Sequence, residues 1–218
     1  MRIAIAGAGK VGRSIAAELA AAGYDILLID RDPKVNDLRI DGVDTIQADA
    51  CEIDSLSNLS LAECQVVVAA TGDDKTNLVC SLLAKTEFGV PRVLARVNHP
   101  KNEWMFDESW GVDTAVSTPR MLSALVEEAV TVGDLVRLMS LRKGQANLVE
   151  FTLAPESAVV GRRVGVVPFP PDTALVAILR DTRVIAPTLD DPLEAGDELL
   201  FIATPDQEKA LLEVLRTN

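Results

Sequence analysis

Three glycines stand at fixed spacing near the start of the chain, in Gly7-Ala8-Gly9-Lys10-Val11-Gly12. They follow an apolar run and open an amphipathic stretch, which predicts a strand, a tight turn and a helix. In that setting Gly7 allows the turn, Gly9 lets the backbone approach a pyrophosphate, and Gly12 lets the helix pack close to the strand. Free N–H groups at the helix start then face the anion. The loop predicts a nucleotide-phosphate site.

Asp30 ends the second apolar run, 18 residues after Gly12. An acid at this place accepts hydrogen bonds from a ribose 2′-hydroxyl and repels a 2′-phosphate, so NADP is disfavoured, although Arg31 beside it weakens that exclusion. Lys10 has two interpretations, which stay open. Either it contacts the second or third phosphate of the nucleotide, or it is a solvated lysine at the start of a helix. It is not a Walker lysine, because the Gly-x-x-x-x-Gly-Lys-Ser/Thr pattern is absent.

Six short apolar runs alternate with six amphipathic stretches up to about Asp134. The runs predict strands over Ile3–Ala6, Asp25–Ile29, Asp44–Gln47, Gln65–Ala69, Arg92–Val97 and Val112–Val116. The stretches predict helices over Lys10–Ala22, Pro33–Ile40, Ile53–Leu59, Lys75–Phe88, Lys101–Ser109 and Pro119–Val132. This alternation predicts an α/β fold with a doubly wound parallel sheet of six strands, a Rossmann domain over residues 1–134.

A doubly wound sheet of order 3-2-1-4-5-6 brings the first and fourth strands to the ligand crevice. Thr71 and Gly72 follow the fourth strand, so we expect them opposite the glycine loop. Asp49-Ala50 follows the third strand and is expected to border the base. Arg96 ends the fifth strand, where it either pairs with phosphate or is an exposed strand-end arginine. Asp73 and Asp74 are expected to cap the next helix.

After Gly133-Asp134 the pattern changes, and a smaller α+β domain is predicted over residues 135–218. Its strands are expected at Leu135–Leu141, Leu148–Leu153, Ala174–Leu179, Arg183–Ala186 and Glu198–Ala203, with Lys143-Gly144-Gln145 joining the first two. A terminal helix over Pro205–Leu215 begins with Thr204 and Gln207 in a capping-box pattern.

Composition excludes several classes of protein. The 33 acidic side chains outnumber the 21 basic ones, which disfavours a nucleic-acid binder or docking on anionic lipid. The longest apolar runs have five residues, and a membrane span needs about 20. The three cysteines form no Cys-x-x-Cys pair, so neither a disulfide framework nor a metal site is predicted, and a reducing cytoplasm is expected.

A helical stripe suggests self-association. It consists of Leu122, Leu125, Val126, Ala129 and Val130, in a helix that follows the sixth predicted strand. Because the sheet is already complete, we expect part of this stripe, with the Trp104–Trp110 segment, to pack against a second subunit. The alternative is that it covers the sheet of its own domain.

Several motifs together resemble a known family. They are the glycine loop, Leu28-Ile29-Asp30, Gln47-Ala48-Asp49-Ala50, Ala69–Asn77 and Leu94-Ala95-Arg96-Val97. They are similar to the nucleotide-binding domain of TrkA/KtrA-type potassium-uptake regulators, the RCK family (regulator of conductance of potassium). The stretch from Val176 to Leu199 resembles that family's C-terminal domain, so the resemblance covers nearly the whole chain.

The resemblance implies a cytoplasmic regulatory subunit that is not an enzyme. It implies a homo-oligomer, a dimer or a dimer-based ring, docked on a potassium-translocating membrane subunit of TrkH/KtrB type. Such regulators bind NAD(H), ADP or ATP between the glycine loop and the second-strand acid. Carried over by position, the ligand contacts fall on Gly7–Val11, Asp30, Asp49, Thr71, Gly72 and Arg96. Cys51 departs from the family pattern, which often has threonine there.

Two other functions fit the same nucleotide motif. An NAD-dependent oxidoreductase would need an acid–base group near the nicotinamide, and His99, the single histidine, follows the fifth predicted strand. A stand-alone nucleotide sensor acting on a soluble partner would have the same ligand site. Turnover of a reduced cofactor would distinguish the oxidoreductase from the potassium-uptake regulator and the stand-alone sensor. Co-purification with a potassium transporter would distinguish the regulator from the sensor.

Overall fold

The computed structural model describes residues 1–141 and 145–216. It contains two compact units, Met1–Pro119 and Arg120–Asn218, which are described one at a time. Helix α4 (Thr118–Val130) falls almost entirely in the second unit, whereas the division predicted at residues 134/135 assigned it to the first. Within the described residues, no helix is both long enough and apolar enough to span a membrane.

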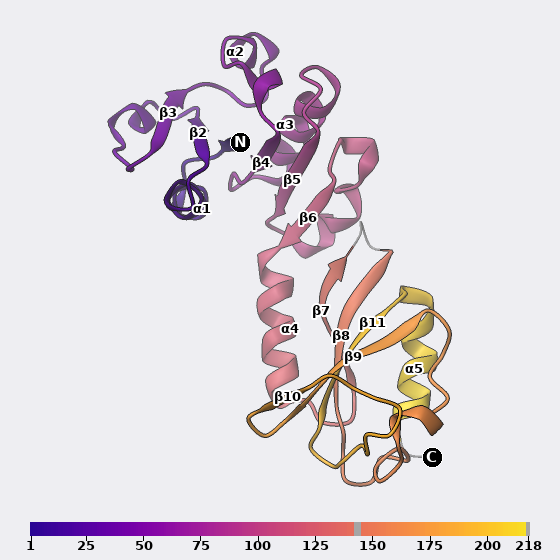
Figure 1. Ribbon diagram of the computed structural model, residues 1–218. Helices are drawn as coiled ribbons and strands as arrows, with labels where there is room; N and C mark the ends of the chain where they lie inside the picture. Colours follow the sequence, from indigo (N-terminus) through magenta and orange to yellow (C-terminus); the bar gives the residue numbers. More distant parts are fainter. Residues whose placement is uncertain (142–144, 217–218) are drawn as a thin grey trace. The chain divides into compact units, whose positions relative to one another are not determined.

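The first unit is a parallel sheet of six strands in the order β3-β2-β1-β4-β5-β6 (Figure 1). The strands are β1 (Arg2–Ala6), β2 (Asp25–Asp30), β3 (Val43–Gln47), β4 (Val66–Ala69), β5 (Arg92–Val97) and β6 (Thr114–Ser117). The prediction of a doubly wound sheet is confirmed. The reversal of strand order lies between β1 and β4, which is where such sheets form a crevice at the carboxyl ends of their strands.

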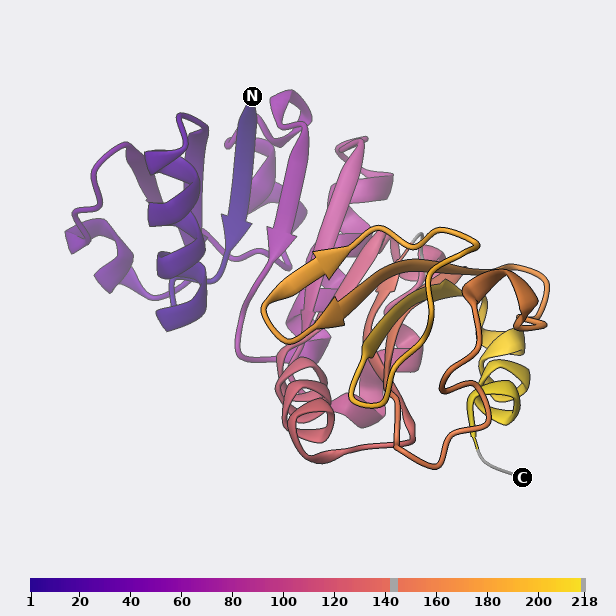
Figure 2. The ribbon, with the colours of Figure 1, turned by 60° about the horizontal axis from the view of Figure 1, so that its bottom comes forward.

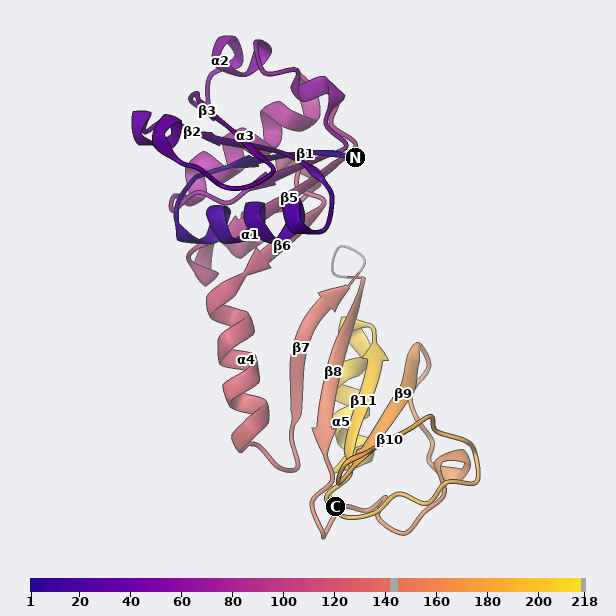
Figure 3. The same cartoon turned by 60° about the vertical axis from the view of Figure 1, so that its left-hand side comes forward.

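Helices cover the two faces of this sheet unequally (Figure 3). Helix α1 (Lys10–Ala21) packs on one face, against Ile3, Ile5, Ile26 and Leu28. Helices α2 (Ile53–Ser57) and α3 (Asp74–Thr86) pack on the other face, where the larger core lies. On the α1 face, the half of the sheet formed by β4, β5 and β6 borders an apolar cavity of about 410 Å³.

Two predicted helices are instead short 3₁₀ turns. The segment predicted over 33–40 is η1 (Pro33–Asp37), and the one predicted over 101–109 is split into η3 (Pro100–Met105) and η4 (Glu108–Trp110). The side chain of Asp107 accepts from the backbone N–H of Ser109 and starts a new turn there, which ends the preceding one. Gly23 has φ +86°, so the chain leaves α1 in the left-handed conformation that glycine adopts without strain.

The second unit contains an antiparallel sheet in the order β10-β9-β11-β8-β7, with the β9–β10 hairpin at one edge (Figure 2). The strands are β7 (Leu135–Leu141), β8 (Ala146–Thr152), β9 (Thr173–Arg180), β10 (Arg183–Ile185) and β11 (Glu198–Ala203). Helix α5 (Glu208–Leu215) buries Leu211 and Leu215 against Phe151 and Phe201. The second α+β domain is thus confirmed as a fold; Lys143 and Gly144 of the predicted connection lie outside the described residues.

The predicted capping box before the last helix is wrong. The Thr204 side chain makes no cap hydrogen bond, and the segment starts as a 3₁₀ turn, η7 (Pro205–Gln207). In this tight turn the Gln207 N–H donates to the backbone carbonyl of Thr204 at 3.0 Å, which takes the place of a side-chain cap.

A buried ion pair fixes the long loop before β11. Asp197 is fully buried and accepts from Arg180 Nε at 2.6 Å and Nη2 at 2.8 Å. The same arginine donates to the Pro192 carbonyl at 2.8 Å, and Asp197 also accepts from the Glu194 N–H. The hydrogen bonds with Asp197, against a smaller effect of burial, raise the pKa of Arg180. A bidentate pair of this kind holds the loop against the end of β9.

Candidate functional site

The glycine loop has the geometry that its three glycines predicted. Gly7 has φ +108°, and a Cβ there would lie 2.9 Å from the Cα of Thr71, so the loop passes directly against the end of β4. A Cβ at Gly12 would lie 1.8 Å from the Gly7 carbonyl oxygen, so α1 can pack here only because this residue is glycine. At Gly9 nothing lies within 4 Å of the added Cβ, which would stand in open space.

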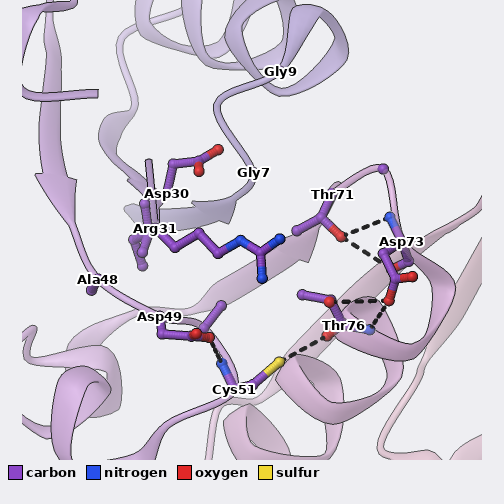
Figure 4. Close-up of a pocket in the computed structure, with 13 residues that line it drawn as sticks. Gly7, Gly9, Asp30, Arg31, Ala48, Asp49, Cys51, Thr71, Asp73 and Thr76 are labelled. Atoms are coloured by element: carbon purple, nitrogen blue, oxygen red, sulfur yellow. Dashed lines mark hydrogen bonds between the residues drawn. The ribbon is translucent and has the colours of Figure 1, made fainter. Parts of the chain in front are cut away.

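A polar cavity of about 420 Å³ opens at the carboxyl ends of the central strands (Figure 4). Eight of the residues predicted to bind a ligand line it: Gly7, Gly9, Asp30, Arg31, Asp49, Ala50, Thr71 and Gly72. These residues come from the ends of strands β1, β2, β3 and β4 and from the loops that follow them. Topology therefore brings together residues that stand more than 60 positions apart in the chain.

The other five predicted residues do not line this cavity. Ala8 lies in the glycine loop. Lys10 is exposed at the first position of α1, and Gly12, in the first turn of the same helix, is buried. Val11 and Arg96 line the apolar cavity instead. The Nε atom of Arg96 is buried without a hydrogen-bond partner in the structure. The strand alternation explains this, because Arg96 shares its face of β5 with Leu94, which also lines the apolar cavity.

Asp30 has a structural role that the sequence did not reveal. One carboxylate oxygen accepts from the Ala8 N–H at 2.6 Å, and the other accepts from the Asp32 N–H at 2.9 Å. The carboxylate therefore ties the glycine loop to the end of β2. Because each carboxylate oxygen has about two acceptor positions, Asp30 can still accept from a hydroxyl in the cavity.

Charge is distributed unevenly around the polar cavity. Asp30, Asp49 and Asp73 contribute carboxylates, and Arg31 contributes the one cationic side chain among its described lining residues. Figure 4 shows that the Arg31 guanidinium reaches across the cavity between Asp30 and Thr71. A planar guanidinium in this position suits recognition of phosphate oxygens.

The β3 side of the cavity is a tight turn. Asp49 accepts from the Cys51 N–H at 2.8 Å, which orients the turn after the strand. Burial, with a smaller effect from Asp49, raises the pKa of the Cys51 thiol. The thiol is therefore neutral at physiological pH and contacts the Thr76 carbonyl rather than acting as a nucleophile.

Opposite the glycine loop, the wall is Thr71 and the first turn of α3. Asp73 caps that helix as predicted, accepting from the Thr76 N–H at 2.8 Å. Thr71 donates through both its N–H and its hydroxyl to Asn77, a fully buried side chain at the end of the Ala69–Asn77 motif to which the sequence assigned no role. Asp74 does not cap the helix; it accepts hydrogen bonds from the segment that follows β5.

His99 lies outside the polar cavity, at the start of η3. Its Nδ1 accepts from the Lys101 N–H at 3.2 Å, so the imidazole caps a turn. The side chain is not among the residues that line either cavity described above. Because His99 caps a turn and lines neither cavity, its position favours a structural role in the loop over a role in acid–base catalysis.

A parallel sheet of this order, with a glycine loop and an acid meeting in a crevice at its carboxyl edge, defines a Rossmann-type dinucleotide-binding fold. The TrkA-N domain model matches residues 3–118, and the TrkA-C domain model matches residues 148–216. The chain belongs to the TrkA family, which confirms the resemblance found in its motifs.

Similar proteins support this membership. The Trk system potassium uptake protein TrkA of Mycobacterium tuberculosis is 57% identical over 216 residues, covering 99% of this chain and 98% of the relative. The GsuK channel matches with a TM-score of 0.64 at 16% identity, covering 100% of this chain and 39% of that one. A GsuK channel bound to NAD matches with a TM-score of 0.51 at 24% identity, covering 98% and 38%. At these identities the structural matches show the fold alone.

Proposed function

We propose that this chain is a regulatory subunit that gates a Trk/Ktr-type potassium-uptake membrane protein in response to an adenine nucleotide, NAD(H) or ADP/ATP. One observation carries the proposal. The glycine loop leaves open space at Gly9, and this space belongs to the same cavity as Asp30 and Arg31. The similar GsuK channel structure that is bound to NAD supports the ligand class.

Each part of the cavity then has a defined task. Backbone N–H groups at the start of α1 bind the phosphates, aided by the helix dipole and by Arg31. Asp30 accepts from the ribose hydroxyls while it keeps Ala8 in place. The turn containing Asp49 and Ala50 borders the base, and the wall at Thr71 closes the opposite side.

Lys10 is the candidate for reading the terminal phosphate. It is exposed at the N-terminus of α1, outside the cavity that holds the rest of the proposed site. From there it reaches a phosphate that projects out of the crevice, alone or together with a basic group of a neighbouring subunit. Arg96, placed in the apolar cavity, is not retained in this role.

We propose that the chain works as a homo-oligomer built from dimers. On α4, Leu122, Leu125, Val126 and Val130 are 55–77% exposed, and the side chain of Ala129 lies outside the described part of the chain. The first unit carries an apolar cavity lined by Ile15, Leu94 and Val116, among others. In the proposed dimer, the exposed apolar stripe of one copy packs against the open apolar cavity of a second copy.

Residues 1–134 then form the nucleotide-binding domain and residues 135–218 a smaller regulatory domain. The proposed partner is a potassium-translocating membrane subunit of TrkH/KtrB type, which would hold this subunit at the cytoplasmic face of the membrane. The name of the Mycobacterium tuberculosis relative, a Trk system potassium uptake protein, supports this partner. A regulator of this kind does no chemistry and shifts its gate only through differential nucleotide affinity for two states.

Potassium flux through the reconstituted membrane subunit tests the function. We expect the flux with ADP to differ from the flux with ATP or NAD when this chain is present, and no difference when it is absent. Equal flux under all conditions would contradict regulation. Oxidation of NADH by the purified chain would favour the oxidoreductase, and nucleotide binding without association with the membrane subunit would favour the sensor of a soluble partner.

A further inference from the structure

We propose that three side chains, Asn77, Asn98 and Asp74, position Thr71 in the wall of the nucleotide cavity and connect it to the turn η3, so that nucleotide binding is sensed at Trp104. These three side chains are called the α3 polar cluster below. The inference rests on the proposed nucleotide-binding function.

Asn77 holds Thr71 through every polar atom of its side chain. Its Oδ1 accepts from the Thr71 N–H at 2.9 Å and from the Thr71 hydroxyl at 2.7 Å. Its Nδ2 donates to the Thr71 carbonyl at 3.3 Å and to the Arg96 carbonyl at 2.8 Å. Asn77 is fully buried, and an amide has two donor hydrogens and one acceptor oxygen with two lone pairs, so all are used. The position of Thr71 is therefore fixed to α3 and β5.

Asn98 joins the same threonine to a buried carboxylate. Its Nδ2 donates to the Thr71 carbonyl and to Asp74 Oδ1, both at 3.0 Å. Its backbone N–H donates to the same Asp74 oxygen at 2.6 Å. The carbonyl of Thr71 thus accepts from two asparagine amides, one on α3 and one after β5.

Asp74 extends the connection into η3. Its second oxygen accepts from the His99 N–H at 3.0 Å and from Asn102 Nδ2 at 2.8 Å. Burial acts to raise the pKa of Asp74, but the hydrogen bonds from Asn98, Asn102 and His99 outweigh it and lower the pKa. The carboxylate is therefore charged in a site where only 8% of the residue is exposed.

Two features indicate a role beyond helix stability. The N-terminus of α3 is already capped by Asp73, so Asp74 and Asn77 are not needed there. A buried polar network in which the amide and carboxylate groups are hydrogen-bonded holds its members in one arrangement. The connection ends at η3, none of whose residues is buried and whose Trp104 is 78% exposed. Hydrogen bonds therefore run without a gap from Thr71 through Asn98 and Asp74 to Asn102 in η3, two residues before Trp104.

Fluorescence and calorimetry of the full chain test this connection. The chain has two tryptophans, so Trp110→Phe leaves Trp104 as the sole reporter. In that background we expect ADP, ATP or NAD to change the Trp104 emission. Asn98→Ala removes the bonds from its amide to the Thr71 carbonyl and to Asp74, so it should weaken nucleotide affinity about ten-fold, a usual size for coupling between two sites, and should abolish the emission change. Asn77→Ala should do the same, and Asn98→Ala carries the test if Asn77→Ala does not fold.

Lys85→Met is the matched control. It removes a part-buried ion pair between the same helix and Asp113 at 2.7 Å, at the other end of α3 from Thr71. We expect it to lower the melting temperature without changing nucleotide affinity or the Trp104 response. If the Trp110→Phe chain binds nucleotide but Asn98→Ala binds equally well, or if Trp104 never responds, the inference is wrong. If the chain binds no nucleotide, the proposed function itself fails.

Discussion

Two open cavities of the first unit have nearly equal volumes, about 420 and 410 Å³, but differ in their linings. The polar cavity at the carboxyl ends of the strands is lined by glycines, three aspartates and Arg31. The apolar cavity on the α1 face is lined mainly by aliphatic side chains, including Ile15, Val68 and Leu94. The two cavities thus differ in the chemistry of their linings and not in size.

This contrast follows from how a strand presents its residues. Along β4, Val66 and Val68 face the α1 side, and Val67 and Ala69 face the opposite core. Only where the strands end do backbone N–H groups and polar loop residues become available to a ligand. One sheet therefore carries a cavity with charged residues at its edge and an apolar cavity on its face.

Among these predictions, the largest effect is the loss of folding stability expected for a substitution at Gly12, where α1 packs against the glycine loop. Gly12→Ala places a Cβ 1.8 Å from the Gly7 carbonyl oxygen, so helix and loop must separate. We expect a loss of about 3 kcal/mol in the free energy of unfolding, measured by urea denaturation. Gly9→Ala is the control, because its Cβ meets nothing within 4 Å. Equal stability of the two variants would mean that the loop does not have this geometry.

The apolar cavity is tested through helix α4. Val126→Asp puts a charge on a residue that is 65% exposed, so the isolated chain should keep its melting temperature. If α4 is buried against a second copy, burying this charge should weaken the dimer by about 3 kcal/mol, roughly a hundred-fold in dissociation constant. Analytical ultracentrifugation measures the shift, with Glu127→Gln as the control. A dimer unaffected by Val126→Asp would place the interface elsewhere.

The ribose side of the polar cavity is tested at Asp30. Asp30→Ala removes an acceptor for the ribose hydroxyls and the bond that holds the Ala8 N–H. We expect nucleotide affinity to fall by about 1–3 kcal/mol, the effect of a hydrogen bond to a charged group. Wild type should prefer NAD over NADP, and the variant should lose part of that preference. Calorimetry showing tighter NADP binding by the wild type would overturn the assignment.

The smallest effect is the change in nucleotide-dependent gating expected for a substitution at Lys10. Lys10→Ala should narrow the difference between ADP and ATP in gating by about 1 kcal/mol, at the lower end of usual allosteric coupling. Adenosine binding through Asp30 should be nearly unchanged, because Lys10 does not line the polar cavity. Potassium flux with each nucleotide, wild type beside variant, gives the result. A variant that keeps the full difference would show Lys10 to be a solvated lysine.

Much of the fold could be predicted because burial leaves a simple signature. Parallel strands covered on both faces are continuous apolar runs, so five of the six predicted strands differ from the observed ones by at most one residue at each end. The last begins at Thr114 rather than Val112, since Gly111 ends the preceding turn and Asp113 binds the backbone of β5. The segments over 33–40 and 101–109 were predicted as helices but form 3₁₀ turns, because the chain is already extended at Leu38 and a new turn starts at Asp107.

The site could be predicted only in part. The glycine loop and Asp30 have fixed spacing, and topology then locates Thr71 and Asp49. Arg96 was assigned by its place at a strand end, but the side on which a strand residue points depends on alternation as well as position. The α3 polar cluster joins Asn98 to Asp74 across 24 positions, and no local spacing indicates such a pairing.

The central claim is that an adenine nucleotide lies against the glycine loop in the polar cavity. Calorimetry of nucleotide binding to wild type and to Gly9→Val is the most direct test of this claim. Gly9 has φ −68°, which valine adopts freely, and its Cβ would enter open space, so the variant should fold and melt like wild type. We predict that wild type binds ADP, ATP or NAD and that the valine side chain, occupying the phosphate position, abolishes binding. A folded Gly9→Val chain that binds these nucleotides as tightly as wild type would contradict the account.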